Sequence, residues 1–188
     1  YGSNNNQIAI ARILKAYYYW FLTDNYGDLP YSEALKGDNG LAVYDSQQSV
    51  YDALFSELAA AVAQFDDGLP VKGDILFGGD NTMWKKFANS MRALIALQIS
   101  KADAAKGKSE FTTALSADGG VFEAGQGAKL SYPDANFPNP VYNYYAVVQR
   151  RDYAISETLT DYLGALADPR VTVFGSSDVG FPYGLTRD

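Results

Sequence analysis

The sequence predicts a mainly all-α protein, made of tetratricopeptide-like antiparallel helix pairs with an irregular, loop-rich overlay. Apolar residues recur at three- and four-residue steps over several long segments, a pattern typical of amphipathic helices that pack against one another. Residues 82–115 read as helix, tight turn and helix, with about the 34-residue length of one tetratricopeptide unit. Residues 121–145 are instead rich in glycine, proline, asparagine and tyrosine, which predicts a covering layer without helical period.

The first helix is expected at about residues 7–23, with Asn4, Asn5 or Asn6 as its N-cap. Gly27 and Pro30 mark its end, because glycine adopts the left-handed conformation readily and proline stops continuation of the helix. The four adjacent rings of residues 17–20 point around the whole circumference, and we interpret them as core or helix-seam residues. The predicted apolar stripe of this helix consists of Ile8, Ala11, Leu14, Tyr18, Phe21 and Leu22.

The second helix has the most regular pattern, begins at Ser46 or Ser49, and ends at the aspartates and glycine of residues 66–68. Its predicted stripe is Val50, Leu54, Leu58, Ala61, Val62 and Phe65. The third helix covers residues 84–100, with Asn81 or Thr82 as its N-cap, and is expected to be the central helix because its stripe is wide. That stripe is Trp84, Phe87, Ala88, Met91, Leu94, Ile95 and Ile99.

Two further helices follow. The fourth is expected at residues 103–115, where Gly107 lowers the helix propensity, and it should pack through Ala105, Phe111 and Leu115. Within residues 121–145, the prolines at positions 133, 138 and 140 exclude a regular helix or a central strand. A late helix at about residues 156–166 is capped by Ser156, and its predicted stripe is Leu159, Tyr162, Leu163 and Leu166.

Composition excludes several kinds of chemistry. The net charge of −7 argues against a nucleic-acid partner, whose phosphates require clustered lysine and arginine. The chain has no cysteine and no histidine, which excludes thiol nucleophiles, histidine acid–base catalysis and ordinary zinc sites. The aspartates within residues 24–28 and 74–80 lack the order of a calcium loop and are expected to serve turns and caps. We therefore expect no metal, no cofactor and no catalytic residue.

Four segments together resemble the SusD/RagB family of outer-membrane nutrient-binding lipoproteins of Bacteroidetes. Residues 16–35, AYYYWFLTDNYGDLPYSEAL, are similar to an aromatic helix followed by a Tyr-Gly-Asp-Val/Leu-Pro turn. Residues 44–62 resemble a helix introduced by Tyr-Asp-Ser/Thr, and residues 84–103 a Trp-x-Lys-x-Ala-Asn-Ser-Leu-Lys/Arg helix. Residues 165–170, ALADPR, are similar to a recurrent Asp-Pro-Arg. The four segments occur in the order found in the family.

The resemblance implies part of a single SusD-like domain, with a helical scaffold at about residues 7–118, an overlay at about 119–155, and a late helix and loop at about 156–188. It also implies non-catalytic capture of glycans or similar nutrients at the surface of the outer membrane. The implied partners are an oligosaccharide or polysaccharide and a SusC-like TonB-dependent transporter. Members are usually more than twice this length, and the implied membrane attachment is a lipid anchor that this sequence does not contain. Ligand-binding residues vary between members, so none is transferred.

The ligand site must therefore be sought in the residues themselves. Sugar rings stack on flat aromatic faces, and proline-stiffened aromatic segments lower the entropic cost of binding. Such segments place Tyr142, Asn143, Tyr144, Tyr145, Phe181 and Tyr183 as candidate ligand-binding residues. The same rings could instead anchor the overlay onto the helices. Two other functions remain open: a helical scaffold for protein–protein contact, and a glycoside hydrolase, whose pair of carboxylates no feature of the sequence singles out.

Overall fold

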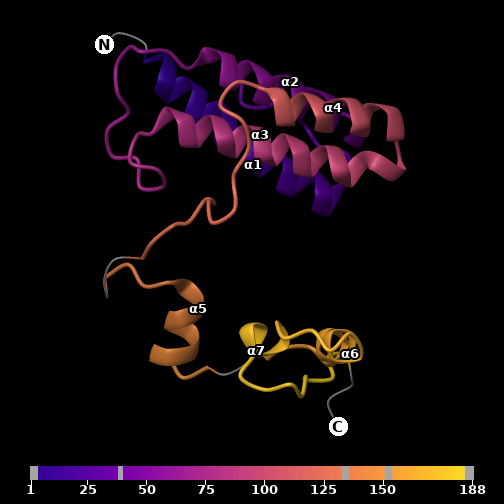
Figure 1. The fold of residues 1–188 in the computed structure, drawn as a ribbon. Coiled ribbons are helices and arrows are strands. Elements are labelled where there is room, and N and C mark those ends of the chain that lie inside the picture. The colour runs from indigo at the N-terminus through magenta and orange to yellow at the C-terminus, as the bar shows by residue number, and fades with distance from the viewer. Residues whose placement is uncertain (1–3, 38–39, 133–135, 151–153, 185–188) are drawn as a thin grey trace. The chain divides into compact units, whose positions relative to one another are not determined.

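The computed structural model describes residues 4–37, 40–132, 136–150 and 154–184. They form two compact units, Tyr1–Ser131 and Tyr132–Asp188, which are described separately below as the first and second units. The first unit holds α1 (Asn5–Tyr26), α2 (Gln47–Gln64), α3 (Asn81–Gln98), the short η1 (Ile99–Lys101) and α4 (Ala104–Ser116). The second holds α5 (Pro140–Tyr142), η2 (Asn143–Val147), α6 (Glu157–Ala165) and α7 (Val171–Phe174) (Figure 1). Helices and two isolated β-bridges account for the regular structure in the described parts of the chain, which confirms the all-α prediction.

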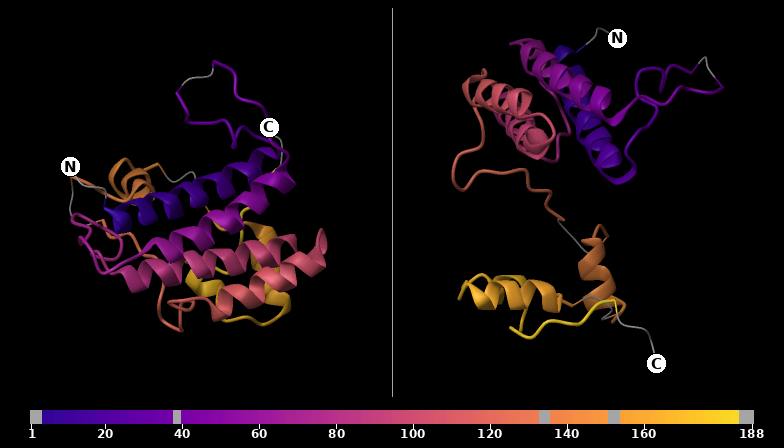
Figure 2. Two further views of the ribbon diagram at one scale, coloured as in Figure 1. Left: turned by 90° about the horizontal axis from the view of Figure 1, so that it is seen from above. Right: turned by 90° about the vertical axis from the view of Figure 1, so that its right-hand side faces the viewer.

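Chain-order neighbours pack side by side in the first unit. α1 packs on α2, α2 on α3, and α3 on α4, in antiparallel pairs (Figures 1 and 2). None of the helices that the structure describes is both long enough and apolar enough to cross a membrane. The two units are described individually, so their membership of one domain stays a prediction.

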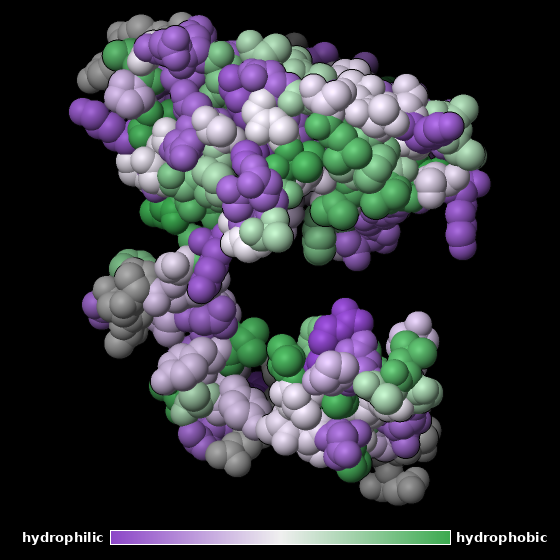
Figure 3. All heavy atoms as spheres, viewed as in Figure 1, coloured by the Kyte–Doolittle hydropathy of each residue, from purple (hydrophilic) through white to green (hydrophobic). Residues whose placement is uncertain are grey.

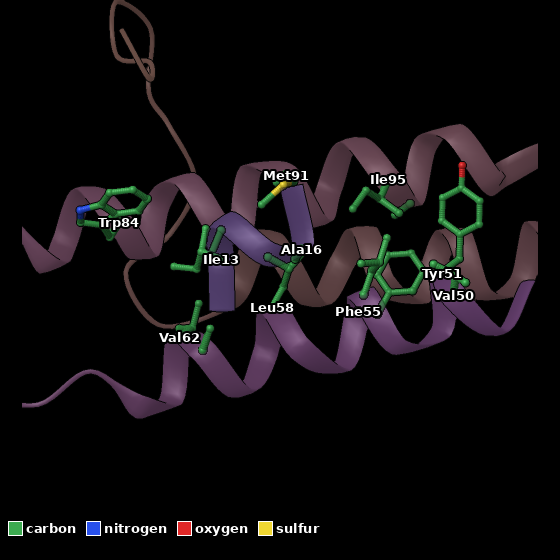
Figure 4. Packing of buried hydrophobic residues seen from close by; sticks show 14 of the residues in the cluster. Ile13, Ala16, Val50, Tyr51, Phe55, Leu58, Val62, Trp84, Met91 and Ile95 are labelled. Carbon is green, nitrogen blue, oxygen red and sulfur yellow. The ribbon is translucent and has the colours of Figure 1, made fainter. Parts of the chain in front are cut away.

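The core of the first unit lies where α2 meets α1 and α3. Side chains of α2 point toward α3, and Ile13 and Ala16 of α1 lie between them (Figure 4). Trp84, at the start of α3, is buried as predicted. The predicted stripe of α2 is confirmed, since five of its members are buried and Phe65 packs against them: Val50, Leu54, Leu58, Ala61 and Val62.

The predicted stripe of α1 is wrong. This helix turns another face to the core, formed by Ala9, Ile10, Ile13 and Ala16. Of the four adjacent rings, Tyr19 and Trp20 pack against the core, whereas Tyr17 and Tyr18 are exposed. Apolar residues occur on both sides of this helix, so periodicity alone could not choose between the faces. All six predicted members are exposed: Ile8, Ala11, Leu14, Tyr18, Phe21 and Leu22.

Several predicted core residues of α3, α4 and α6 are also exposed, and smaller neighbouring residues are buried in their place. On α3, Leu94 is exposed, while Ala93 and Ala96 are buried. On α4, Ala105 and Leu115 are exposed; Ala114 and Gly107 form the buried face, with Phe111 packed against the core. On α6, Leu163 and Thr160 are buried, and the exposed members of the predicted stripe are Leu159, Tyr162 and Leu166. Small residues mark where two helices approach closely, and leucine spacing does not report them.

Gly107 illustrates this close approach. A β-carbon at this position would lie 2.8 Å from the carbonyl oxygen of Ala96 and 3.1 Å from the Cα of Ser100. Both are backbone atoms, which cannot give way as a flexible side chain does. The glycine that weakens α4 by propensity is therefore the residue that lets α4 pack tightly on α3.

The helix starts follow ordinary capping chemistry, with one correction. The side chains of Asn4, Ser46 and Ser156 accept hydrogen bonds from backbone amides in the first turns of α1, α2 and α6, as predicted. For α3, the cap is Asp80 rather than Asn81 or Thr82. Its carboxylate accepts hydrogen bonds from the amides of Thr82 (2.8 Å) and Met83 (3.1 Å).

Asp74 organises the loop between α2 and α3. Its carboxylate accepts hydrogen bonds from the amides of Leu76 (2.9 Å), Phe77 (3.3 Å) and Gly79 (2.9 Å). It also accepts one from the indole nitrogen of Trp84 (2.7 Å). Burial by itself raises the pKa of Asp74, but these hydrogen bonds outweigh it and hold the pKa below its ordinary value. One carboxylate thus joins the loop to the buried start of α3.

The second unit corrects the prediction that proline excludes helix from residues 121–145. Pro140 occupies the first turn of α5, where a residue without an amide hydrogen loses no helical hydrogen bond. Asn139 caps this turn by accepting hydrogen bonds from the amides of Val141 (2.9 Å) and Tyr142 (3.2 Å). The chain then continues as the π-helix η2. Pro133 lies outside the described residues.

Asp74→Asn should lower the free energy of unfolding by about 1–3 kcal/mol, because each carboxylate oxygen accepts two of the four hydrogen bonds and asparagine replaces one of these oxygens with a donor group. Urea unfolding followed by circular dichroism measures the change. Asp67→Asn, at an exposed turn position, is the matched control and should leave stability nearly unchanged. Equal effects of the two substitutions would contradict the role assigned to Asp74.

Gly107→Ala should destabilise the chain by about 1–3 kcal/mol, since overpacking against backbone exceeds the gain in helix propensity. Gly164→Ala on α6 is the control, because its β-carbon would meet no atom within 4 Å. That substitution should stabilise by about 0.5–1 kcal/mol. Thermal unfolding of both variants should show a lower melting temperature for Gly107→Ala and a higher one for Gly164→Ala. A higher melting temperature for Gly107→Ala would contradict the close packing of α4 on α3.

Stability should fall in acid. Hydrogen bonds from Ser32 and Tyr31 lower the pKa of Asp45, and the pKa of Asp74 is lowered as described. Because these folded-state values lie below the ordinary value of 3.8, the stabilisation is complete above it and is lost as the pH falls through the folded values. Unfolding free energies measured from about pH 5 to about pH 2 should therefore decrease steadily. A constant free energy over that range would contradict this assignment.

Candidate functional site

The first group of predicted site residues lies on one short helical segment of the second unit. Tyr142 ends α5, and Asn143, Tyr144 and Tyr145 begin η2. The three tyrosine rings are 61%, 49% and 46% exposed, and Asn143 is half-buried. Side chains with about half of their surface exposed can offer ring faces to a ligand. About half of their surface is also buried, so both roles considered from the sequence, ligand binding and anchoring of the overlay, fit these rings.

The second group, Phe181 and Tyr183, is held against the segment that leads into α6. The two rings meet edge to face, with centroids 5.0 Å apart. The Tyr183 hydroxyl accepts a hydrogen bond from the amide of Ala154 (2.8 Å) and donates one to its carbonyl oxygen (2.9 Å). Phe181 forms an isolated parallel bridge with Ser156. The pair is thus fixed by both backbone and side chain while each ring stays half-exposed.

Gly180 makes this bridge possible. A β-carbon at that position would overlap the backbone of Ser156 and Glu157. The amide of Glu157 donates to the carbonyl oxygen of Phe181 (3.0 Å), and the amide of Phe181 donates to that of Ile155 (2.7 Å). The glycine therefore sets the position of Phe181 relative to the start of α6.

The structure brings Phe181 and Tyr183 together and places residues 142–145 on consecutive helical positions. The candidate residues thus make up two aromatic surfaces, one on residues 142–145 and one formed by Phe181 and Tyr183. Both can stack on a flat apolar ring, and Asn143 can supply a donor and an acceptor beside the first.

Carboxylates in the first unit serve structure. Asp28 accepts a hydrogen bond from the amide of Gln47 (2.8 Å), and Asp24 accepts one from the Tyr51 hydroxyl. Burial, reinforced by that bond, raises the pKa of Tyr51. In the part of the chain that the structure describes, no three acidic side chains are grouped to hold a metal ion. Turn and cap roles, which the sequence indicated, account for Asp28, Asp74 and Asp80, whereas Asp24 instead joins α1 to α2 through Tyr51.

One aromatic surface was not predicted as a site. In the first unit a groove of about 500 Å³, called the tyrosine groove below, is lined by Tyr19, Leu22, Tyr26, Leu29, Pro30 and Tyr44. The sequence showed tyrosines on both sides of the turn after α1, but Tyr44 is distant along the chain. It joins the others because Leu29 and Asp45 pair in an antiparallel bridge. Figure 3 shows one face of each unit coloured by hydropathy, and hydrophobic residues (green) are visible on the surface of both units.

Comparisons with known proteins agree with one another. A family model described as starch-binding and associating with the outer membrane matches residues 2–186. A structure named as a chitin-binding protein is 33% identical with a TM-score of 0.77, over 89% of this chain and 36% of its own. A SusD homologue from Bacteroides vulgatus is 25% identical with a TM-score of 0.76, over 90% of this chain and 34% of its own.

A chitin-binding SusD homologue from Flavobacterium johnsoniae is 27% identical with a TM-score of 0.75, over 87% of this chain and 35% of its own. The chain thus spans about a third of the length of these solved relatives. No curated protein matches it. Because the family model covers nearly all of its residues, the chain belongs to the SusD-like family, described as starch-binding and associating with the outer membrane.

Proposed function

We propose that the chain is part of a non-catalytic protein that captures glycans at the surface of the outer membrane and passes them to a SusC-like TonB-dependent transporter. Membership of the SusD-like family supports the outer-membrane location and a glycan ligand. Two of the solved relatives are named as chitin-binding, and the family as starch-binding. Chitin- and starch-type oligosaccharides are therefore the ligands to test first.

Exposed, positioned aromatic rings carry this proposal. Tyr142, Tyr144 and Tyr145 present ring faces from a segment whose start is fixed by the Asn139 cap and Pro140. Sugar rings have an apolar C–H face that stacks on such a surface, and their hydroxyl groups can pair with the amide of Asn143. Capture without bond cleavage needs only these two kinds of contact.

Phe181 and Tyr183 extend the same chemistry. Because the Tyr183 hydroxyl is already paired with Ala154, this ring is immobilised before a ligand arrives. A fixed ring loses less conformational entropy on binding than a free one, and more of the contact energy then appears as affinity. Neither ring carries a charge at neutral pH, which suits an uncharged polymer.

Replacing Tyr142 and Tyr144 together with alanine should weaken binding of chito- or malto-oligosaccharides about tenfold or more, a loss of at least about 1.4 kcal/mol. Isothermal titration calorimetry of the chain measures it. Tyr162→Ala, which removes a 65%-exposed ring on α6, is the control and should bind as the unmodified chain does. Glycan binding that is equally strong in all three proteins would place the ligand elsewhere.

A further inference from the structure

The tyrosine groove is a built surface of the first unit. Tyr19, Leu22 and Tyr26 come from the last turns of α1, Leu29 and Pro30 from the turn that follows, and Tyr44 from the segment before α2. Leu29 is buried, whereas Tyr26 and Tyr44 are 75% and 74% exposed. The groove therefore combines a buried leucine with two tyrosines that are largely exposed. Its volume of about 500 Å³ lies within the ~300–1,000 Å³ range of small-ligand sites.

The turn that shapes the groove is held rigidly. Gly27 has a φ of 75°, in the left-handed region, and its amide donates to the carbonyl oxygen of Thr23 (2.8 Å). The buried Thr23 hydroxyl donates to the carbonyl oxygen of Gly27 (2.8 Å). Gln47 at the start of α2 donates through its side chain to the carbonyl oxygen of Thr23 (2.7 Å). The end of α1, and with it Tyr26, is thus tied to α2.

Asp45 holds the segment that carries Tyr44. Its backbone pairs with Leu29 through hydrogen bonds of 3.1 and 3.0 Å, which hold the adjacent Tyr44 beside the turn. Its carboxylate accepts hydrogen bonds from the amides of Tyr31 (3.0 Å) and Ser32 (2.7 Å) and from the Ser32 hydroxyl (2.9 Å). The backbone under Tyr26 and Tyr44 is therefore in place before any ligand binds, which lowers the cost of binding.

The lining also selects by charge. The chain carries a net charge of −7, yet every residue that lines the groove has an uncharged side chain at neutral pH. Tyr19 packs edge to face on Tyr31, with centroids 4.7 Å apart, and burial raises its pKa, so it stays neutral. An uncharged ligand with flat apolar faces and a polar rim fits such a surface. Each tyrosine matches it with an apolar ring and a hydroxyl.

We propose that the tyrosine groove is a glycan subsite separate from the aromatic surfaces of the second unit, in which Tyr26 and Tyr44 stack on sugar rings of one polysaccharide chain. This inference rests on the proposed function, since it takes a glycan as the ligand. It goes beyond it by assigning a place on the helical scaffold where part of that ligand binds.

The test measures both affinity and place. Replacing Tyr26 and Tyr44 together with alanine should weaken binding of long chito- or malto-oligosaccharides about tenfold or more, while the double phenylalanine variant should retain most of the affinity because it keeps the rings. Tyr18→Ala is the matched control, since this ring is 63% exposed on the same helix but does not line the groove. In the unmodified chain, bound oligosaccharide should protect Tyr26 and Tyr44, but not Tyr18, from nitration mapped by mass spectrometry.

Three other results would overturn the inference, each in a distinguishable way. If the chain binds oligosaccharide but Tyr26 and Tyr44 are unprotected and their removal changes nothing, the groove is no subsite and the proposed function stands. If the unmodified chain binds neither oligosaccharide, the proposed function fails and the inference fails with it. If the two rings become protected without sugar as the protein concentration rises, a second copy of the chain occupies the groove.

Discussion

The first unit depends on the closed apolar seam where α2 meets α1 on one side and α3 on the other. Leu54, Leu58, Met91 and Ile95 are almost entirely removed from solvent there, together with Ile13 of α1. Burial of each such side chain contributes roughly 1.5–3 kcal/mol, so these few positions supply much of what holds the helices together. The connecting loops then join helices that this seam holds side by side.

Polar side chains then attach the loops to this frame. Asn6 is buried, donates to the carbonyl oxygens of Asp66 and Leu69, and accepts from the amide of Asp66, which ties the start of α1 to the end of α2. Asn89 does the same for the chain after α4 through the carbonyl oxygens of Asp118 and Gly120. Asp74 and Asp45 serve the remaining long loops. Acidic residues that could be mistaken for catalytic groups therefore have structural partners.

Apolar side chains hold the helices together and polar side chains hold the loops, which indicates where binding surfaces can occur. The seam takes up the scaffold's most regular apolar stripes, and buried amides and carboxylates hold the loops. Some of the exposed aromatic rings lie on connecting segments that hydrogen bonds hold in place, as at Tyr44 beside Asp45 in the first unit and at Tyr183 in the second. A rigid frame with aromatic faces on its connections suits recognition of a neutral polymer, because the frame loses little entropy when the polymer binds.

The sequence by itself determined the helical class, the order and approximate bounds of the main helices, most of their caps, the buried face of α2 and the family. Apolar periodicity and helix capping depend on residues close together in the sequence, so both can be recognised without the tertiary structure. It could not determine which face of α1 is buried, because both faces are apolar, or that Pro140 begins a helix. It predicted the rings of the second unit as site residues but not the tyrosine groove. Tyr26 and Tyr44 line one groove because Leu29 pairs with Asp45, a contact between distant segments that tertiary structure alone decides.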